Sequence, residues 1–115
     1  MPPLTGPERL RHYRAALSAW SCSGYVNWTA RAQEWVRENL PGVTPREVAR
    51  LMWEHVQGGG RIDEARETRP EWCEHEFHHD LRLRIGDRDV YVETRLLMER
   101  DVDDSTIHVV SIHDA

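Results

Sequence analysis

The sequence contains no lysine, only two cysteines and no long hydrophobic run. A lone and distant pair, Cys22 and Cys73, does not make the disulfide framework of a small secreted domain, so we expect both thiols to be reduced. No apolar stretch reaches the length that crosses a bilayer, and residues 1–6 lack the charged and apolar regions of a signal peptide. These absences predict a cytoplasmic protein that makes no membrane contact.

The missing lysine also bears on the kind of partner. All 15 basic residues are arginines, whose planar side chains suit carboxylates and phosphates, although a biased genomic base composition explains this preference more simply. The 20 acidic residues give a net charge of −5. This balance argues against a protein whose whole surface is built to hold phosphates.

The residues present are sufficient for one folded domain. A chain of 115 residues, 39% hydrophobic and with five tryptophans, can bury a core without disulfides or metal. Pro7 suits the first turn of a helix that runs to about Trp20, with Leu10, Tyr13 and Leu17 at helical spacing. We therefore expect a single domain over 1–115, in which residues 1–22 add an extra N-terminal helix to a unit over 23–115.

Two more helices are predicted before residue 60. The second begins near Asn27 or Thr29 and ends at Pro41-Gly42; its apolar face consists of Trp28, Ala32, Trp35 and Val36. The third begins at Thr44-Pro45-Arg46-Glu47, a capping box with proline in the first turn, and ends at Gly58-Gly59-Gly60.

The second half of the chain predicts an antiparallel sheet. Residues 77–85 alternate between apolar and polar side chains, and Gly86-Asp87 suits a two-residue hairpin turn into a strand over 88–97. A third strand follows over 106–112, and the charged segment 61–72 is expected to be extended and to hold at most one short strand. The fold class is therefore α+β, with N-terminal helices packed on a C-terminal antiparallel sheet of three or four strands.

The hairpin divides this sheet into an apolar face and a polar face. Its turn pairs Leu83 with Val90 and Leu81 with Val92 on the apolar face, and Arg82 with Tyr91 and Arg84 with Asp89 on the polar face. In the third strand Ile107 and Val109 point one way and Val110 and Ile112 the other, so we expect that strand to lie centrally and to be covered on both sides.

The polar face carries residues suited to phosphodiester chemistry. Cleaving RNA without a metal needs a base, an acid and cations that stabilise the transition state. Tyr91, Glu93 and His113 are the candidate catalytic residues: Glu93 or a histidine as base, His113 or Tyr91 as acid. Arg82, Arg84 and Arg95 are the candidate substrate-binding cations. In the simpler alternative these charges only pair across strands, and His113 belongs to a frayed terminus.

The segment Cys73-Glu74-His75-Glu76-Phe77-His78-His79-Asp80 is dense in metal-ligand types. On a strand, Cys73, His75 and His79 would point one way and His78 the other, so a metal site would need a remote fourth ligand such as His108 or His113. The spacing fits no closed zinc site, and the simpler interpretation is that these histidines are half-buried strand residues and surface polar groups.

Several stretches resemble the RelE-like ribonuclease toxins, the MqsR-type toxins in particular. They are Ser23-Gly24-Tyr25-Val26, Thr29-Ala30, Asp89-Val90-Tyr91-Val92-Glu93-Thr94 and Val109-Val110-Ser111-Ile112-His113. The resemblance implies helices on a curved antiparallel sheet, cleavage of messenger RNA on its open face, and neutralisation by a cognate antitoxin. It also implies roles for Tyr91, in the strand after the hairpin, and for His113, after the last strand.

Three functions follow from these residues. The first is a toxin-type, metal-independent endoribonuclease that needs no cofactor and acts on RNA. The second is a non-enzymatic protein-interaction domain that uses Trp53, the acidic loop 99–104 or the open sheet face. The third is a metal-binding domain built on Cys73 and the nearby histidines.

Overall fold

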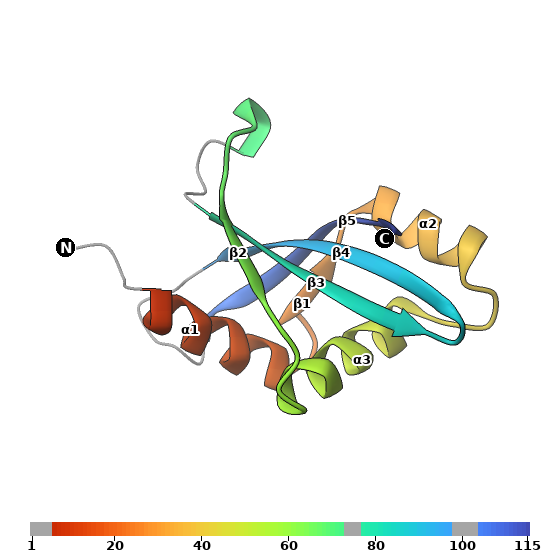
Figure 1. The fold of residues 1–115 in the computed structure, drawn as a ribbon, viewed down its shortest axis with the longest axis horizontal. Coiled ribbons are helices and arrows are strands. Elements are labelled where there is room, and N and C mark those ends of the chain that lie inside the picture. The colour runs from red at the N-terminus through yellow and green to blue at the C-terminus, as the bar shows by residue number, and fades with distance from the viewer. Residues whose placement is uncertain (1–5, 73–76, 98–103) are drawn as a thin grey trace.

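The computed structural model describes residues 6–72, 77–97 and 104–115, and it is an α+β fold (Figure 1). Helices and a sheet account for most of this part of the chain. The elements are α1 (Gly6–Ser18), β1 (Val26–Trp28), α2 (Ala30–Asn39), α3 (Pro45–Gln57), β2 (Asp63–Arg66), the short 3-10 helix η1 (Pro70–Trp72), β3 (Phe77–Ile85), β4 (Arg88–Leu97) and β5 (Thr106–Asp114).

The sheet is larger than predicted and it is mixed. Its five strands are ordered β1-β5-β4-β3-β2, and β1 runs parallel to β5 while the other neighbours are antiparallel. The charged segment 61–72 supplies one short strand, β2, as expected. The extra strand β1 occupies residues that were expected to begin the second helix. These residues pair with β5 instead, because the Tyr25 carbonyl accepts a hydrogen bond from the Ile107 N–H and the Thr29 N–H donates one to the Val109 carbonyl. Thr29 then caps α2, whose first residue is Ala30.

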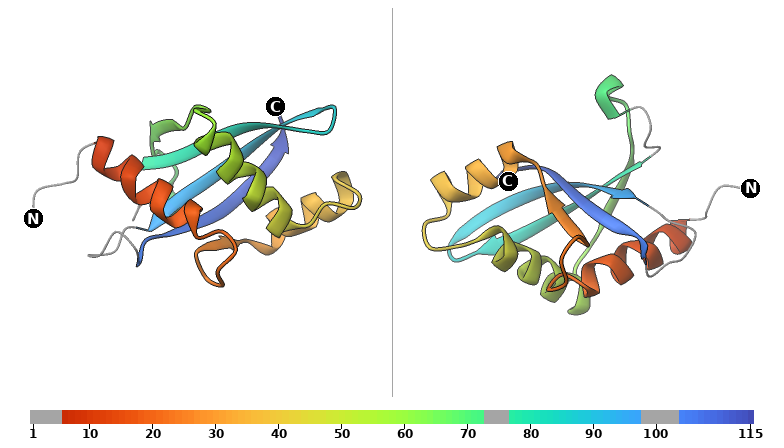
Figure 2. Two further views of the ribbon diagram at one scale, coloured as in Figure 1. Left: turned by 90° about the horizontal axis from the view of Figure 1, so that it is seen from below. Right: turned by 180° about the vertical axis from the view of Figure 1, so that it is seen from behind.

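One face of the sheet is covered by α1 and α3, and α2 lies beside β5 (Figure 1, Figure 2). The core between helices and sheet includes the fully buried Tyr13, Leu17, Met52 and Leu81. Trp53, offered above as a residue that could bind a partner protein, is partly buried and packs against this core. The opposite face of β3, β4 and β5 is not covered by α1 or α3, and we call it the open face.

The predicted hairpin register is confirmed. Arg82 pairs with Tyr91, Leu83 with Val90, and Arg84 with Asp89. Gly86 has a φ of 65°, a conformation that the turn requires and that glycine adopts without strain. The period-two pattern of residues 77–92 therefore sets which side chains reach the open face.

The prediction for β5 was right about its position and wrong about its faces. The strand lies between β1 and β4, but a bulge breaks its alternation: Glu93 pairs with Ser111 and Thr94 with Val109, so that Val110 has no partner on β4. The bulge puts Ile107, Val109 and Ile112 together in the core. His113, expected beyond the strand, lies within β5 and pairs with Tyr91.

Within residues 6–72, 77–97 and 104–115, no helix has the length and apolar content needed to cross a membrane. The acidic loop proposed as a docking segment, residues 99–104, lies almost entirely outside the described residues.

Candidate functional site

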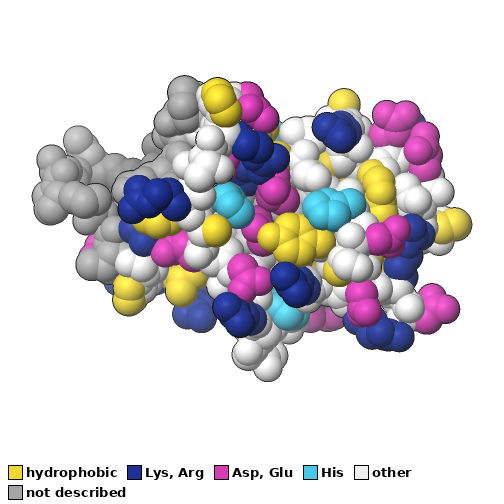
Figure 3. Space-filling view, turned by 45° about the horizontal axis from the view of Figure 1, so that its top comes forward, with side chains coloured by type: hydrophobic (Ala, Val, Ile, Leu, Met, Phe, Trp, Pro, Cys, Tyr) yellow, Lys and Arg dark blue, Asp and Glu magenta, His cyan; other side chains and the backbone are white. Residues whose placement is uncertain are grey.

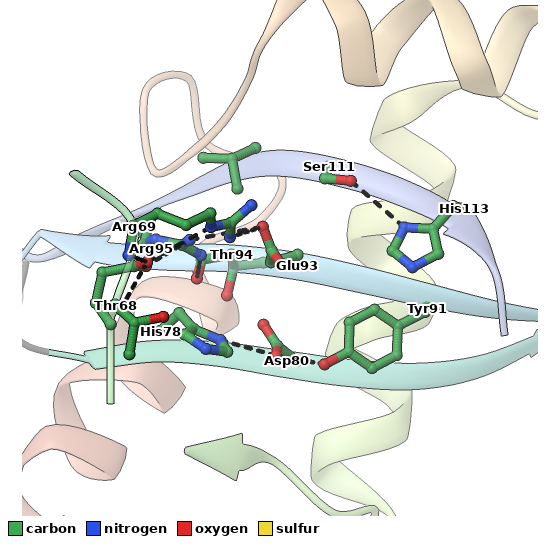
Figure 4. A network of polar contacts seen from close by, with 12 residues as sticks. Thr68, Arg69, His78, Asp80, Tyr91, Glu93, Thr94, Arg95, Ser111 and His113 are labelled. Carbon is green, nitrogen blue, oxygen red and sulfur yellow. Dashed lines mark hydrogen bonds and ion pairs between the residues drawn. The ribbon is translucent and has the colours of Figure 1, made fainter. Parts of the chain in front are cut away.

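The open face holds two groups of polar side chains, and Figure 4 labels several members of each. The first, which we call the Tyr91 cluster, consists of His78, Asp80, Arg82, Tyr91 and His113. The second, the Arg95 cluster, consists of Glu67, Arg69, Trp72, Glu93 and Arg95. The six site residues predicted from the sequence are thus divided: three lie in the Tyr91 cluster, two in the Arg95 cluster, and Arg84 in neither.

The Tyr91 cluster is centred on the aromatic ring of Tyr91. The His113 ring lies against it, with centroids 5.2 Å apart and planes inclined by 33°. The Arg82 guanidinium is 5.6 Å from the centre of the same ring, from the paired position on β3. A histidine, a phenol and a cation therefore converge at one place on the open face.

Asp80 anchors the inner side of the Tyr91 cluster. Its Oδ2 accepts a hydrogen bond from the Tyr91 hydroxyl at 2.5 Å and lies 2.8 Å from His78 Nδ1. Burial, together with the hydrogen bond to Asp80, raises the pKa of Tyr91, so the phenol stays protonated at neutral pH. Sequence reasoning placed Asp80 and His78 on the polar side of β3 but gave Asp80 no role. Its position two residues from Arg82 on the same face was the available signal.

The Arg95 cluster is closed and internally paired. The Arg95 side chain is fully buried, with Nη2 2.5 Å from Glu67 Oε2 and 3.5 Å from Glu93 Oε2. Arg69 pairs with Glu93, and the Arg95 guanidinium lies 5.4 Å from the Trp72 ring. Burial alone would raise the pKa of Glu67, but the Arg69 N–H and the charges of Arg95 and Arg69 lower it. Segment 67–72 thus covers the part of the open face that surrounds Glu93 and Arg95 on β4.

These contacts change the roles available to the predicted residues. Arg95 is buried beneath Glu67 and Trp72, so it cannot reach a substrate on the surface. Glu93 Oε2 contacts the guanidinium groups of both Arg69 and Arg95, so this carboxylate is engaged in ion pairs within the Arg95 cluster. Arg84 remains exposed and pairs with Asp89 at 3.2 Å.

A pocket of about 350 Å³ opens beside the Tyr91 cluster. It lies where β2 pairs with β3, and Asp63 on β2 is opposite Asp80. Arg61, Asp63, His78, Asp80, Arg82 and Tyr91 are among its lining residues. Figure 3 looks onto this side and shows acidic, basic and histidine side chains interspersed, with no uniformly basic patch.

The predicted metal-ligand segment is only partly described. Cys73 and His75 lie outside the described residues. His78 and His79 point to opposite sides of the sheet, as predicted: His78 faces Asp80, and His79 is buried against Glu64 and Tyr13. The described residues contain no group of three or more ligand side chains placed to hold a metal ion.

Comparison of the chain with protein-family models, curated proteins and solved structures finds no match. The site must therefore be interpreted from its own geometry.

Proposed function

We propose that the Tyr91 cluster binds RNA and cleaves it without a metal ion, as an endoribonuclease of the toxin type. The observation that carries this proposal is the ring-to-ring contact of His113 and Tyr91, with the Tyr91 hydroxyl bonded to Asp80 and Arg82 above the same ring. This arrangement supplies a proton donor, a proton acceptor and a cation within one site. Such a set is sufficient for transfer of an RNA phosphodiester to its own 2′-hydroxyl.

The roles follow from the contacts. The 2′-hydroxyl gives its proton to the Tyr91 oxygen while Tyr91 passes its own proton to Asp80, so that Asp80 is the base and acts through Tyr91. The 2′-oxygen attacks phosphorus, and the 5′-oxygen leaves with a proton from protonated His113. Arg82 stabilises the charged phosphorane. The products are a 2′,3′-cyclic phosphate and a 5′-hydroxyl end.

This scheme replaces Glu93 as the base. Glu93 Oε2 is paired with Arg69 and Arg95, so this carboxylate belongs to the closed Arg95 cluster and not to the Tyr91 cluster. None of the contacts described above pairs Asp80 with an arginine. Its Oδ2 already accepts a hydrogen bond from the Tyr91 hydroxyl.

The proposal is tested by incubating the purified protein with RNA in EDTA. A positioned acid or base contributes about 10²–10⁴-fold to the rate, so His113→Ala and Tyr91→Phe should each lower the cleavage rate by at least about 100-fold. The cleaved ends should carry 2′,3′-cyclic phosphate, detected by mass spectrometry.

His108→Ala is the matched control, because His108 lies on the same strand and pairs opposite Arg95, away from Tyr91. It should leave cleavage unchanged. No cleavage by the unaltered protein, or equal rates in all variants, would overturn the proposal.

A second candidate, a non-enzymatic protein-interaction domain, is favoured by the charge balance of the open face. Glu67 and Glu93 neutralise Arg69 and Arg95, and Asp63 lies beside Arg61 and Arg82. A surface with paired charges of both signs attracts polyanions weakly. A protein that binds no RNA but is retained by a defined partner, and loses that partner in Tyr91→Ala, would support this candidate over the first.

A further inference from the structure

We infer that the free edge of β1 and the groove beside it bind an extended, acidic peptide segment of a partner protein, which adds to the sheet as a strand. The groove consists of two adjoining pockets of about 430 and 410 Å³, and we call it the β1 groove. No residue of the Tyr91 cluster lines either pocket. This docking surface therefore goes beyond the proposed function and does not depend on RNA cleavage.

The first observation is the unpaired edge of β1. It is the outermost strand of the described sheet, and its neighbour there is β5, to which the Tyr25 carbonyl and the Thr29 N–H bond. Alternate residues of a strand direct their backbone groups to opposite sides, so Val26 and Trp28 direct theirs to the free edge. Of these groups, only the Trp28 carbonyl has a partner among the described residues, the Gln33 side-chain amide at 3.3 Å. The other three are available to an added strand.

The second observation is that this edge opens onto two connected pockets. Trp20 and Trp28 line the first pocket, and Gln33 and Pro45 line both, so the two pockets adjoin. The second pocket has three apolar side chains in its lining: Val36, Leu40 and Val43. In strand addition the backbone supplies affinity, and pockets for the side chains of the added strand supply specificity. The β1 groove offers both.

The third observation is the charge of the groove, which selects an acidic segment. The protein has a net charge of −5, yet no aspartate or glutamate lines either pocket, whereas Arg46 lines the first and Arg37 the second. Both arginines are exposed, and neither pairs with a carboxylate among the described residues. The Arg46 guanidinium lies 5.4 Å from the centre of the Trp20 ring. Peptide carboxylates therefore gain charge-assisted hydrogen bonds without displacing an existing ion pair.

Two other occupants fit this groove less well. A second copy of the chain, paired edge to edge, would bring two sets of these arginines together, and like charges repel. An RNA strand would use the arginines, but it has no row of N–H and C=O groups to match the edge. Two cations also give RNA only a weak electrostatic attraction.

The test selects binders for the unaltered protein from a phage-displayed library of random dodecapeptides. We expect enriched peptides to combine Asp or Glu with Val, Ile or Leu at alternating positions. Replacing their acids by Asn or Gln should weaken binding at least about tenfold, because the charge-assisted contacts are lost. Fluorescence anisotropy of the labelled peptide measures this change.

Variants of the protein test the two cations. Arg37→Gln and Arg46→Gln should each weaken binding of the enriched peptide about threefold, and the double variant about tenfold. Arg14→Gln is the matched control, because it removes an exposed arginine of α1 that lines neither pocket. It should leave binding unchanged.

Two further measurements locate the peptide. N-methylation of one alternating set of its amides should prevent binding and N-methylation of the other set should not, because every second residue of an added strand bonds to β1. Cys22 is an exposed, free thiol that lines the first pocket, so it should react with iodoacetamide more slowly when the peptide is bound. Mass spectrometry of the fragment that contains Cys22 measures the reaction on the unaltered protein, independently of whether a variant folds.

The outcomes decide between the possible occupants. Enrichment of no peptide, or of peptides that bind the double variant equally well, would overturn the inference. A labelled oligouridine that binds the unaltered protein and not the double variant, with no acidic peptide enriched, would assign the groove to RNA. A dimer in sedimentation that the double variant does not form would assign the edge to a second copy. None of these results depends on RNA cleavage, so the proposed function is tested separately.

Discussion

Arg95 lies in the middle of β4 with its guanidinium enclosed by acidic and aromatic side chains. A buried cation is tolerated only when partners compensate the loss of water, and Glu67 and Glu93 do so here. Those partners come from two different segments, so the charge of Arg95 joins β4 to segment 67–72. The polar contacts of one residue thereby determine how much of the open face remains accessible.

Glu67→Gln should lower the free energy of unfolding by about 3 kcal/mol, because it leaves the Arg95 charge buried with one distant partner. The glutamine oxygen can still accept from the Arg69 N–H, so the local turn is preserved. Urea denaturation measures the change.

Glu54→Gln on α3 removes an acid from an exposed ion pair with Arg50 and should alter stability by no more than about 0.5 kcal/mol. A similar small effect for Glu67→Gln would show that Arg95 does not depend on Glu67.

Among the elements, β5 illustrates how a bulge changes the side that a residue faces. With regular alternation, Ile112 and Val109 would point to opposite sides; the unpaired Val110 brings both into the core and puts His113 beside Tyr91. The bulge is held by Thr29, whose hydroxyl donates to the Val110 carbonyl at 3.2 Å and accepts from the Ala32 N–H. One side chain therefore caps α2 and fixes the bulge.

Thr29→Ala should destabilise the protein by about 1–2 kcal/mol, since it removes a helix cap and a hydrogen bond to a strand carbonyl. Thr29→Ser keeps the hydroxyl and should stay within about 0.5 kcal/mol of the unaltered protein. Equal stability of the alanine and serine variants in urea denaturation would contradict this account.

The hairpin was predictable because a period-two pattern and a glycine turn fix the register of residues 77–92 from neighbouring residues alone. β1 was not, because three residues carry no period and its partner strand is distant in sequence. The bulge was also not predictable, since Val109 and Val110 are both apolar and either could point to either face of the sheet. At the site, Tyr91 and His113 were predicted on one surface, whereas Glu67 and Trp72, which cover Arg95, come from segment 61–72, which has no periodic pattern.

At the scale of the whole molecule, α1 contributes side chains to the core. The sequence had suggested that this helix is an extra element attached to a unit over residues 23–115. The Tyr13 ring stacks near His79, and Arg9 forms two hydrogen bonds with Glu64, which also contacts His79 Nε2 at 2.8 Å. Helix α1, β2 and β3 are thus joined by one partly buried polar network.

This network makes global stability depend on pH. Burial lowers the pKa of His79 from 6.5, although Glu64 partly opposes the shift; Tyr13, Arg9 and Asp80 are the other polar groups around the ring. The unfolded chain therefore binds the His79 proton more readily than the folded protein. Stability is complete above about pH 6.5 and declines as the pH falls below that value, by at most about 1.4 kcal/mol per pH unit for one proton.

Urea denaturation between pH 8 and pH 5 should show this decline, and His79→Gln should flatten it. The carboxyl groups of Glu64 and Glu67, with pKa values lowered from 4.5, bind protons only at more acidic pH and do not contribute in this range. A decline of the same steepness in His79→Gln would assign the pH dependence to another group.

The parallel pairing of β1 with β5 also orders events during synthesis on the ribosome. β1 is made early, yet its only neighbour in the described sheet is a strand whose contacting residues, such as Val110 beside Thr29, are 81 positions later. Until those residues leave the exit tunnel, Val26 and Trp28 have no partner strand and stay open to chaperones. The hairpin of β3 and β4 can form first, and β5 then completes the sheet by inserting between β4 and β1.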